Sequence, residues 1–443
     1  MAREVEQITA RFFADRRSGR LDLGAAEFEV RAAMHTVGSV LLEQLLNADH
    51  GGQSGPRLAC GHGHEAEFVD YRTKHLQTIL GDVHIRRAYY YCGQCPEDRG
   101  RGVIPKDQEL DVVGTSFSPG LRRLMARVGA QQPFDAARRD LAEVAGVGVA
   151  TKALERISEA VGAAAEAANE AERAALRTGT AQPSPATHRL YIEMDGTGVP
   201  VVPKETQGRA GKAADGTAKT REAKLGCVFT QFHFDAEGWP VRDPEATTYV
   251  GAIETAEQFG PRLHAEAVRR GLTPATTVIV LADGAPWIWN RADEHFPGAV
   301  QIVDLYHARE HLEAVRRLAF GSGGAVGPAW VTARRDELDD GDVDVIIAEI
   351  RKLPAVSDPN RQDELRKEAE YFETNKFRMC YKYFRARGFF VGSGVVEAGC
   401  KTVIGQRLKQ SGMRWTVAGA NAVIALRCRL LGNRWDDLWR SAA

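Results

Sequence analysis

The chain has 443 residues, enough for about two or three domains rather than one ordinary hydrophobic core. Lys and Arg number 58 against 59 Asp and Glu, so the formal net charge of −1 excludes binding to nucleic acid through overall positive charge and leaves only local basic patches. The first residues are charged throughout, and the apolar runs at 276–282 and 343–350 are too short to span a bilayer. We therefore expect a soluble, cytoplasmic protein.

The N-terminal part begins with a predicted helical segment, residues 1–55. Within it, residues 24–48 carry apolar side chains at three- and four-residue spacing, which predicts an amphipathic helix. Glycines at 51, 52 and 55 then break the chain. Residues 76–92 alternate and are rich in β formers, which predicts a hairpin that turns near Gly81 and Asp82.

A candidate metal site lies in residues 56–107. Cys92 and Cys95 form a C-x₂-C pair after strand-like text, as in a zinc ribbon, and Cys60-Gly-His62-Gly-His64 supplies a first half. Cys60, one of the two histidines, Cys92 and Cys95 could form a tetrahedral site for a structural Zn²⁺. The alternative is a reduced CxxC turn that binds no metal. The four remaining cysteines lie among apolar neighbours, which indicates small buried residues: Cys227, Cys380, Cys400 and Cys428.

Residues 108–176 are predicted to be helical, and the stretch 135–162 has the pattern of a helix-turn-helix. Four basic side chains of this stretch could contact DNA: Arg138, Arg139, Lys152 and Arg156. An ordinary helical hairpin fits the same text. The polar, proline-containing residues 177–188 are predicted to be a linker.

A different pattern begins at Arg189. A basic, Gly-rich loop at 203–222 follows the first strand. Helices are predicted at 254–271 and 285–296, between strands at 189–202, 226–241, 247–253, 276–284 and 299–307. This order, closed by a helix near Gly394, is that of an RNase H-like fold. We therefore predict an α/β RNase H-like catalytic domain over 189–443 with an all-α insertion at about 311–390. The zinc-ribbon-like module and the helical region precede this domain.

Three acids are candidates for a catalytic metal site. Asp195 and Asp283 each follow an apolar strand and precede a glycine that lets the backbone turn sharply away, which places a carboxylate at the rim of a sheet. Glu397 opens the last helical stretch and could reach the same place. Hard oxygen ligands suit Mg²⁺ or Mn²⁺, and two such ions can serve phosphodiester chemistry. Any single Asp at such a position is also a common turn residue.

The motifs DGTGVP, LADGAPWIW, DLYHAREHL and GSGVVEAGCK…RLKQSGMRW, together with the CGQC region, resemble bacterial insertion-sequence transposases of the ISKra type. The resemblance covers nearly the whole chain. It implies an RNase H-like domain with a helical insertion, a DDE triad at Asp195, Asp283 and Glu397, and two Mg²⁺ or Mn²⁺ ions. The chain departs from the family at Cys60-Gly-His62-Gly-His64, where a second C-x₂-C normally stands.

Several further residues are candidates for contact with DNA. Asp304 and His307 form a D-x-x-H element that we expect to organise the site or touch the DNA end; a satisfied turn pair is the alternative. Trp287 could stack on an unpaired base, and we expect it or Trp289 to be buried. Basic or aromatic groups of the 203–222 loop and of the stretch after Glu397 complete the predicted set: Lys204, Arg209, Lys212, Lys219, Arg221, Lys401, Arg407, Lys409, Arg414 and Trp415.

The predicted function is a DDE transposase that binds the terminal inverted repeats of an insertion sequence and catalyses metal-dependent cleavage and strand transfer. Its partners would be double-stranded transposon ends and target DNA, with at least a homodimer on DNA in the nucleoid. The first alternatives are a domesticated DNA-binding protein that no longer cuts and a nuclease of the same fold. The third is a zinc metalloprotease, because HAREH places His307, Glu310 and His311 as H-x-x-E-H.

Overall fold

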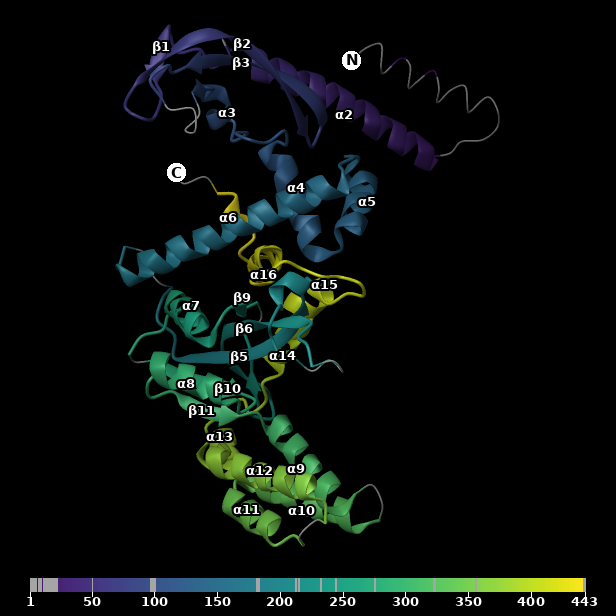
Figure 1. Ribbon diagram of the computed structural model, residues 1–443, viewed down its shortest axis with the longest axis vertical. Coiled ribbons are helices and arrows are strands. Elements are labelled where there is room, and N and C mark those ends of the chain that lie inside the picture. Colours follow the sequence, from purple (N-terminus) through teal and green to yellow (C-terminus); the bar gives the residue numbers. More distant parts are fainter. Residues whose placement is uncertain are drawn as a thin grey trace. The chain divides into compact units, whose positions relative to one another are not determined.

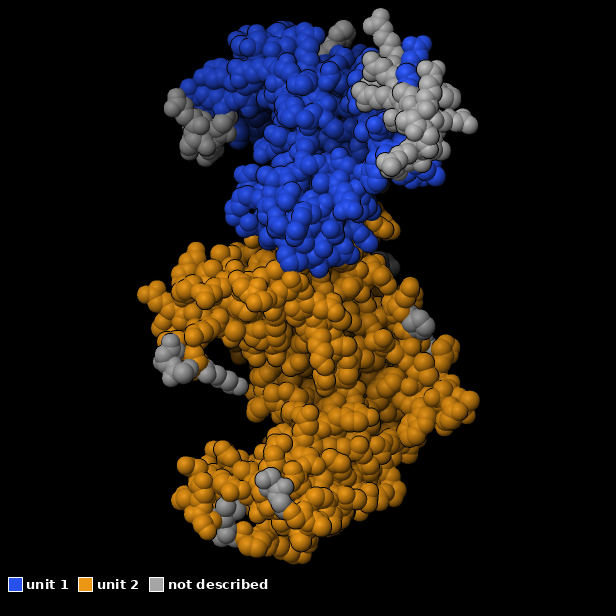
Figure 2. Space-filling view, turned by 90° about the vertical axis from the view of Figure 1, so that its right-hand side faces the viewer, with its two compact units in different colours: residues 1–158 blue, residues 159–443 orange. Residues whose placement is uncertain are grey.

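The computed structural model describes residues 6, 10, 23–49, 51–95, 101–180, 184–211, 213, 216–231, 233–243, 245–274, 276–321, 324–354 and 357–440. The protein is mixed α/β, as Figure 1 shows. It divides into two compact units, residues 1–158 and 159–443, coloured blue and orange in Figure 2. No helix in these described segments is both long and apolar enough to cross a bilayer.

The first unit contains a four-stranded antiparallel sheet. Its strands, in sheet order, are β1 (Arg57–Ala59), β2 (Glu65–Thr78), β3 (Gly81–Tyr91) and β4 (Gly102–Val103). The pairing of β2 with β3 confirms the predicted hairpin, with its turn at Ile79 and Leu80. Because β1 and β4 are short, the two long strands carry most of this sheet.

The predicted amphipathic helix of the first unit is α2 (Leu23–Asn47). At its end, the Asn47 amide donates to the His84 carbonyl at 2.8 Å and accepts from the Arg86 backbone N–H at 2.7 Å. These bonds hold the helix end against β3 through backbone groups that would otherwise need another partner.

The rest of the first unit is helical. Its helices are α3 (Pro105–Glu109), α4 (Pro119–Gln131), α5 (Phe134–Ala145) and the start of α6 (Thr151–Arg177). Leu121, Met125 and Leu154 are fully buried in their common core. Gly146 ends α5 in the left-handed conformation with φ 69°, where glycine avoids the strain of a side chain. Helices α5 and α6 span the stretch predicted as a helix-turn-helix, and the boundary between the two units falls inside α6.

The second unit is built on a five-stranded sheet. Its strands, in sheet order, are β11 (Val300–Val303), β10 (Thr277–Ala282), β5 (Arg189–Pro200), β6 (Thr220–Thr230) and β9 (Thr248–Ala252). Strands β5, β10 and β11 run parallel, whereas β6 is antiparallel to both β5 and β9. Residues 184–188 of the predicted linker belong to this unit, since Thr277 donates to the His188 carbonyl at 2.9 Å.

The strand predicted at 226–241 is corrected by the structure. Strand β6 starts earlier and ends at Thr230, and a separate small hairpin follows, β7 (His233–Phe234) and β8 (Pro240–Val241). The Asp235 carboxylate makes this turn, because it accepts from the backbone N–H groups of Glu237 at 3.1 Å and Trp239 at 2.7 Å.

Helices cover both faces of the large sheet. A Cβ on Gly226 would lie 2.7 Å from Leu263 of α7 (Ala256–Arg269), so α7 lies close against β6 on one face. A Cβ on Gly399 would lie 3.0 Å from Leu225, which faces the opposite way on the same strand. The C-terminal elements that include Gly399 are α14 (Gly394–Gly399), a π-helical turn (Cys400–Gly405), α15 (Gln406–Leu408) and α16 (Val417–Leu431).

Helix α8 (Pro286–His295) joins β10 to β11, and a helical insertion separates β11 from α14. The insertion consists of α9 (Leu305–Phe320), α10 (Val326–Asp340), α11 (Val343–Arg351), α12 (Pro359–Asn375) and α13 (Tyr381–Ala386). Short 3₁₀ turns lie at Pro203–Glu205, Lys376–Arg378 and Asp436–Leu438. The helical block is present as predicted, and its first helix starts at Leu305 instead of near 311.

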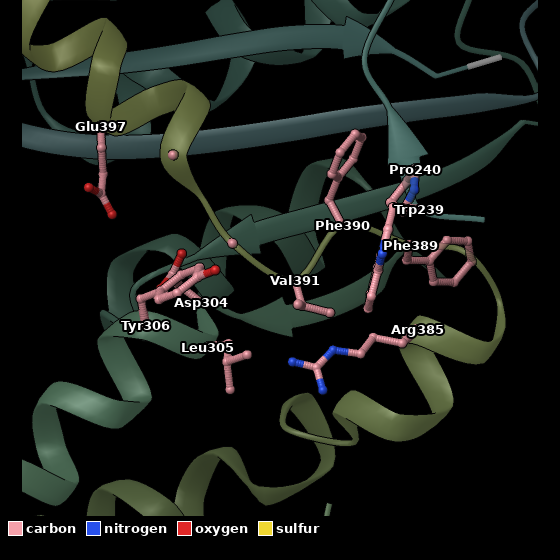
Figure 3. A pocket seen from close by; sticks show the side chains of 12 residues that line it. Trp239, Pro240, Asp304, Leu305, Tyr306, Arg385, Phe389, Phe390, Val391 and Glu397 are labelled. Atoms are coloured by element: carbon pink, nitrogen blue, oxygen red, sulfur yellow. The ribbon is translucent and has the colours of Figure 1, made fainter. Parts of the chain in front are cut away.

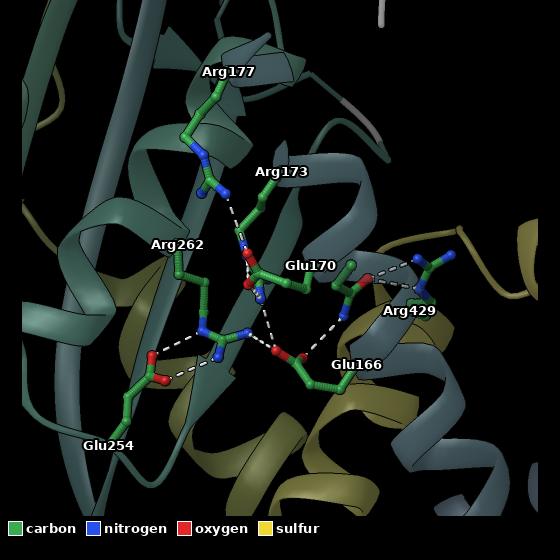
Figure 4. A network of polar contacts seen from close by, with 8 residues as sticks. Glu166, Glu170, Arg173, Arg177, Glu254, Arg262 and Arg429 are labelled. Atoms are coloured by element: carbon green, nitrogen blue, oxygen red, sulfur yellow. Dashed lines mark hydrogen bonds and ion pairs between the residues drawn. The ribbon is translucent and has the colours of Figure 1, made fainter. Parts of the chain in front are cut away.

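A network of ion pairs ties the later part of α6 to α7 within the second unit (Figure 4). Arg262 binds Glu254 through two bonds of 2.8 and 2.9 Å and Glu166 through one of 2.7 Å. Although burial acts in the opposite direction, the Arg262 and Arg173 guanidinium groups hold the pKa of Glu166 below its usual value. This partly buried network makes the end of α6 a structural part of the second unit.

Candidate acidic active site and metal-binding cluster

A cysteine–histidine cluster lies at one end of the first unit's sheet. Ligand atoms of Cys60, His64, Cys92 and Cys95 all lie within 4.8 Å of one another, and the three cysteines are buried. Three sulfurs and one imidazole nitrogen are a donor set that suits tetrahedral Zn²⁺. The cluster could therefore hold a zinc ion, as the sequence predicts.

The local backbone explains how the first half of this cluster forms. Gly61 and Gly63 have φ angles of 81° and 85°, and neither would bring a Cβ near another atom. The turn they allow directs the backbone N–H groups of His62 and His64 at the Cys60 sulfur, which lowers the pKa of that thiol. Both imidazoles approach Cys95, through Nδ1 at 3.6 Å for His62 and 3.5 Å for His64, but only His64 belongs to the cluster.

In the second unit, Asp195 lies on β5 and faces α14. It pairs with Leu225, and Glu193 pairs with Cys227, so both acids share the sheet face that α14 covers. The prediction that Asp195 ends its strand is wrong. Strand β5 continues to Pro200 because β6 goes on pairing with it, whereas the parallel pairing with β10 stops at Glu193. Asp195 therefore lies just past the point where β10 leaves β5.

The sequence predicts that Gly196 turns the chain, but the structure shows no turn there. It stays in the strand opposite Lys224, and its hydrogen instead leaves room for the Glu222 side chain, which a Cβ would overlap. The backbone N–H of Gly196 donates to Asp195 Oδ1 at 2.6 Å. This bond fixes one oxygen of the Asp195 carboxylate.

Asp283 follows directly on β10, the strand beside β5. Its Oδ1 accepts from the Ala285 N–H at 2.9 Å, and its backbone carbonyl accepts from the Tyr371 hydroxyl of α12 at 3.0 Å. Here the glycine does turn the chain: Gly284 has φ 100°, and a Cβ there would lie 2.8 Å from the Tyr371 ring. The insertion thus contacts the backbone of this acid.

Glu397 lies in α14, and two buried acids fix the start of that helix. Glu193 Oε2 accepts from the Val396 N–H at 2.8 Å, and Asp304 Oδ2 accepts from the Ser393 N–H. The Ser393 hydroxyl in turn lies 3.4 Å from Glu397 Oε1. The backbone of α14 is therefore tied both to β5 and to the end of β11.

The electrostatics of this region follow from burial. Desolvation raises the pKa of Asp195; hydrogen bonds from Cys400 and Gly196 oppose this shift, and the charge of Asp283 adds to it. Desolvation also raises the pKa of Glu193 to about 8, with a further contribution from Asp304, so Glu193 is mainly protonated at neutral pH. Burial beside Asp195 raises the pKa of the Cys400 thiol.

The helix that carries Glu397 widens into a π-helical turn directly afterwards. The buried Arg427 satisfies carbonyls that this widening exposes, donating to Val403 O at 2.6 Å and to Thr402 O. Lys409, one of the predicted DNA contacts, donates to the Thr197 hydroxyl on β5, two residues beyond Asp195. The predicted contacts Lys401 and Arg414 are exposed.

Two predicted DNA contacts after Glu397 are corrected by the structure. Arg407 is 0% exposed and lies 4.9 Å from the centre of the Trp415 ring. Trp415 is itself buried and donates to the Leu408 carbonyl at 3.1 Å. These side chains pack against each other inside the unit, so neither is available to contact DNA here.

The residues predicted around the triad have structural partners. Asp304 is buried and caps α9 by accepting from the His307 N–H at 2.7 Å, whereas the His307 ring lies 5.0 Å from that of His311. Trp289 is buried, as expected for one of the two tryptophans. Trp287 is half-buried beneath the Lys224 ammonium group, 4.4 Å from the ring centre.

The H-x-x-E-H text does not gather a metal site in the described part of the chain, where the cysteine–histidine cluster is the one group of at least three ligand atoms all within 4.8 Å. Instead, His311 Nδ1 lies 2.6 Å from Glu368 and its ring stacks on Tyr371 at 3.6 Å. Asp195, Asp283 and Glu397 do not form such a group either.

The other predicted DNA contacts lie on the surface or are paired with acids. In the helical region, Arg138 and Arg139 pair with Asp135, Lys152 pairs with Glu155, and Arg156 is exposed. In the loop between β5 and β6, Arg221 donates to the Glu205 carbonyl at 3.2 Å. Three basic residues of that loop are exposed, namely Lys204, Arg209 and Lys219, and Lys212 lies outside the described residues.

Sequence reasoning missed Glu193 and Tyr371. Glu193 stands two residues before Asp195 in YIEMDG, and the two-residue period of a strand places it on the same face, a signal that could have been used. Tyr371 lies 88 residues from Asp283 in the sequence, and no local pattern predicts their contact. Comparison of the chain with models of known protein families and with curated proteins gives no match.

Proposed function

We propose that this protein is a DDE transposase with an RNase H-like catalytic domain. The proposal rests on one arrangement: Asp195 and Asp283 lie where two adjacent parallel strands separate, and the helix that carries Glu397 is bonded to the first of those strands. In open α/β sheets, ligands bind in the crevice where neighbouring strands separate, outside their carboxyl ends. The resemblance of the motifs around the same three acids to ISKra-type transposases points to the same function.

The sheet order supports the proposed fold. Three antiparallel strands come first in the chain, two parallel strands then extend the sheet from β5, and a helical block precedes the final helices. This is the order that the sequence predicts for an RNase H-like domain with an insertion. The insertion lies between Asp283 and Glu397, where the resemblance implies it.

The donor set suits hard divalent cations. Asp195, Asp283 and Glu397 offer carboxylate oxygens, the ligands that Mg²⁺ and Mn²⁺ prefer. Burial raises the pKa of Asp195, and the charge of Asp283 adds to this shift. A pair of ions about 3.5–4 Å apart would supply activation of the attacking oxygen and stabilisation of the leaving oxygen. Such a pair tolerates ligands that are spread more widely than around one ion.

The protein's own residues would position the reacting strand. The Gly196 and Ala285 N–H groups each hold one carboxylate oxygen of an acid, and the Cys400 thiol also bonds to Asp195. Lys409 lies on the same side of β5 as a candidate for phosphate contact. The zinc-binding module and the helices α5 and α6 are candidates for recognition of the element's inverted repeats, and joining two ends requires at least two copies on DNA.

The test is an assay of end cleavage and joining. Purified protein, Mg²⁺ and a labelled end of the DNA element that flanks the gene are incubated with a plasmid target. We expect nicking and joining by the wild type, loss of both in Asp195→Asn and Asp283→Asn, and retention of both in Glu310→Gln.

Each other outcome points to an alternative. Specific binding without cleavage would favour a DNA-binding protein that no longer cuts, and cleavage without joining would favour a nuclease. Unchanged cleavage by Asp195→Asn would refute the acidic site. Zinc-dependent peptide hydrolysis lost in Glu310→Gln would favour the metalloprotease.

A further inference from the structure

A cavity of about 620 Å³ opens beside Glu397 in the second unit (Figure 3). Three separate parts of the chain form its walls. The β7–β8 hairpin contributes Trp239, the start of α9 contributes Tyr306, and the segment before α14 contributes Val391. Its size is in the range of small-ligand pockets in proteins.

Two aromatic rings are the main feature of this cavity. Trp239 is 57% exposed and Tyr306 is 64% exposed, although each is large and mainly apolar. Leu305 and Val391 line the cavity between them in Figure 3. Exposed aromatic surface gathered around a concave site indicates a ligand with a flat apolar face.

Contacts within the unit position the backbone of Trp239 and one edge of the Tyr306 ring. Trp239 stands at the turn that Asp235 fixes through its 2.7 Å bond to the Trp239 N–H. The Tyr306 ring lies against Gly392, where an added Cβ would be only 3.0 Å away. Such positioning lowers the entropy lost when a ligand stacks on a ring.

Charge is divided across the cavity. Figure 3 shows the Arg385 guanidinium group and the Glu397 carboxylate at separate places on its wall, with Asp304 on the side of Glu397. A ligand there would meet acids at one end and, at the other, Arg385, which is also paired with Asp339 at 3.3 Å. An uncharged planar group on one of the rings, with a phosphate near Arg385, fits this division better than a compact anion does.

We propose that this cavity binds an unpaired nucleobase of the DNA strand next to the scissile phosphate. The inference rests on the proposed function, because Glu397 belongs both to the acidic triad and to the cavity wall. A base stacked on Trp239 or on Tyr306 would hold the strand on the Arg385 side while the neighbouring phosphate reaches the acids. The cavity would thereby select DNA whose end is already unpaired or easily opened.

The binding step can be tested without cleavage. Anisotropy in EDTA compares three fluorescein-labelled duplexes of one sequence: blunt, with a short oligothymidine overhang, and with an abasic overhang of equal length. Stacking on aromatic side chains predicts that the thymidine overhang tightens binding to the wild type by roughly 5- to 100-fold, and that the abasic overhang, which keeps only the phosphates, does not.

Variants assign the effect to the cavity. Trp239→Ala should lose the advantage of the thymidine overhang, Trp239→Phe should keep most of it, and Phe377→Ala, which removes an exposed aromatic ring outside the cavity, should keep all of it. Photo-cross-linking of a 5-iododeoxyuridine overhang to the wild type should label Trp239 or Tyr306. Equal binding of the abasic and thymidine overhangs, or an advantage that survives Trp239→Ala, would overturn the proposal.

The transposase proposal and the base-pocket proposal can each be refuted independently of the other. Wild-type protein that prefers the thymidine overhang but never cleaves with Mg²⁺ would refute the transposase and support the base pocket. Wild-type protein that cleaves but binds all three duplexes equally would refute the base pocket alone.

Discussion

The carboxyl group of Glu193 accepts a hydrogen bond of 2.8 Å from the backbone N–H of Val396, 203 residues away in the sequence. Val396 directly precedes Glu397, and Glu193 stands two residues before Asp195 on the same face of β5. One bond therefore joins the strand that carries the first candidate catalytic acid to the helix that carries the third. Because the insertion separates these elements along the chain, this tie helps to set the position of Glu397.

The first prediction concerns this tie. Glu193→Gln should stay close to the wild type at neutral pH, because an amide oxygen also accepts from Val396. Glu193→Leu keeps a similar volume but leaves a buried N–H unsatisfied, which costs about 1–3 kcal/mol of the free energy of unfolding and should slow DNA cleavage as well. Urea unfolding and the end-cleavage assay measure the two effects. A glutamine variant as damaged as the leucine variant would mean that the ionised carboxylate is needed.

The second prediction concerns the pH dependence of stability. Glu193 is ionised above its usual pKa of 4.5 in the unfolded chain, but folding raises this pKa to about 8. The folded state therefore binds the proton more tightly, so the contribution of this group to stability is full below pH 4.5 and falls as the pH rises toward 8.

The glutamine side chain of Glu193→Gln does not titrate, so the loss of stability between pH 4.5 and pH 8 should be absent from this variant. Urea midpoints measured from pH 5 to pH 8 should converge on the acid side, and the wild type should drop below the variant on the alkaline side. Parallel curves would show that Glu193 does not titrate differently on folding.

Local sequence patterns predicted the large sheet well. Strands β10 and β11 are short apolar runs followed by polar residues, and Asp283-Gly284 makes the turn expected of it. The strand predicted at 189–202 forms as β5, but the place of Asp195 within it could not be predicted in the same way. Whether a strand stops at Asp195 depends on which neighbour still pairs with it, and β6 continues after β10 has left.

Local sequence patterns also failed to predict which side chains near the site are buried. Arg407 and Trp415 look like a basic and an aromatic contact for DNA, but the backbone at Trp415 bonds to the end of β5, at Pro200 and Val202, and this draws both side chains inside. Similarly, the role of Glu193 depends on a partner from beyond the insertion. Such long-range contacts decide which side chains are buried at the candidate site, and sequence spacing does not encode them.

The third prediction separates the two candidate zinc ligands. His64→Ala and Cys92→Ser should each lose a bound zinc ion, because both remove members of the cluster whose ligand atoms lie within 4.8 Å of one another. His62→Ala should keep its zinc, although the two histidines are only two residues apart. Metal content measured on the purified variants decides this. Full zinc content in Cys92→Ser would rule out the site, and loss of zinc only in His62→Ala would exchange the two histidines.

The fourth prediction contrasts the two glycines that follow Asp195 and Asp283. Gly284 has φ 100°, and a Cβ would press on the Tyr371 ring, so Gly284→Ala must strain the backbone or displace an insertion helix. Backbone strain of this kind costs roughly 1–3 kcal/mol of unfolding free energy. At Gly196 the nearest atoms that a Cβ would meet belong to the Glu222 side chain, whose carboxylate is about half exposed and can swing away.

Gly196→Ala should therefore unfold close to the wild type, and Gly284→Ala should be clearly less stable. Because Tyr371 donates to the Asp283 carbonyl, Gly284→Ala should also reduce cleavage by more than its loss of stability explains at a temperature where both variants are folded. Tyr371→Phe isolates that bond: it removes the hydroxyl but keeps the ring, so its cleavage defect should be smaller than that of Gly284→Ala. If both glycine variants unfold alike, the close approach of Tyr371 to Gly284 does not constrain the Asp283 turn.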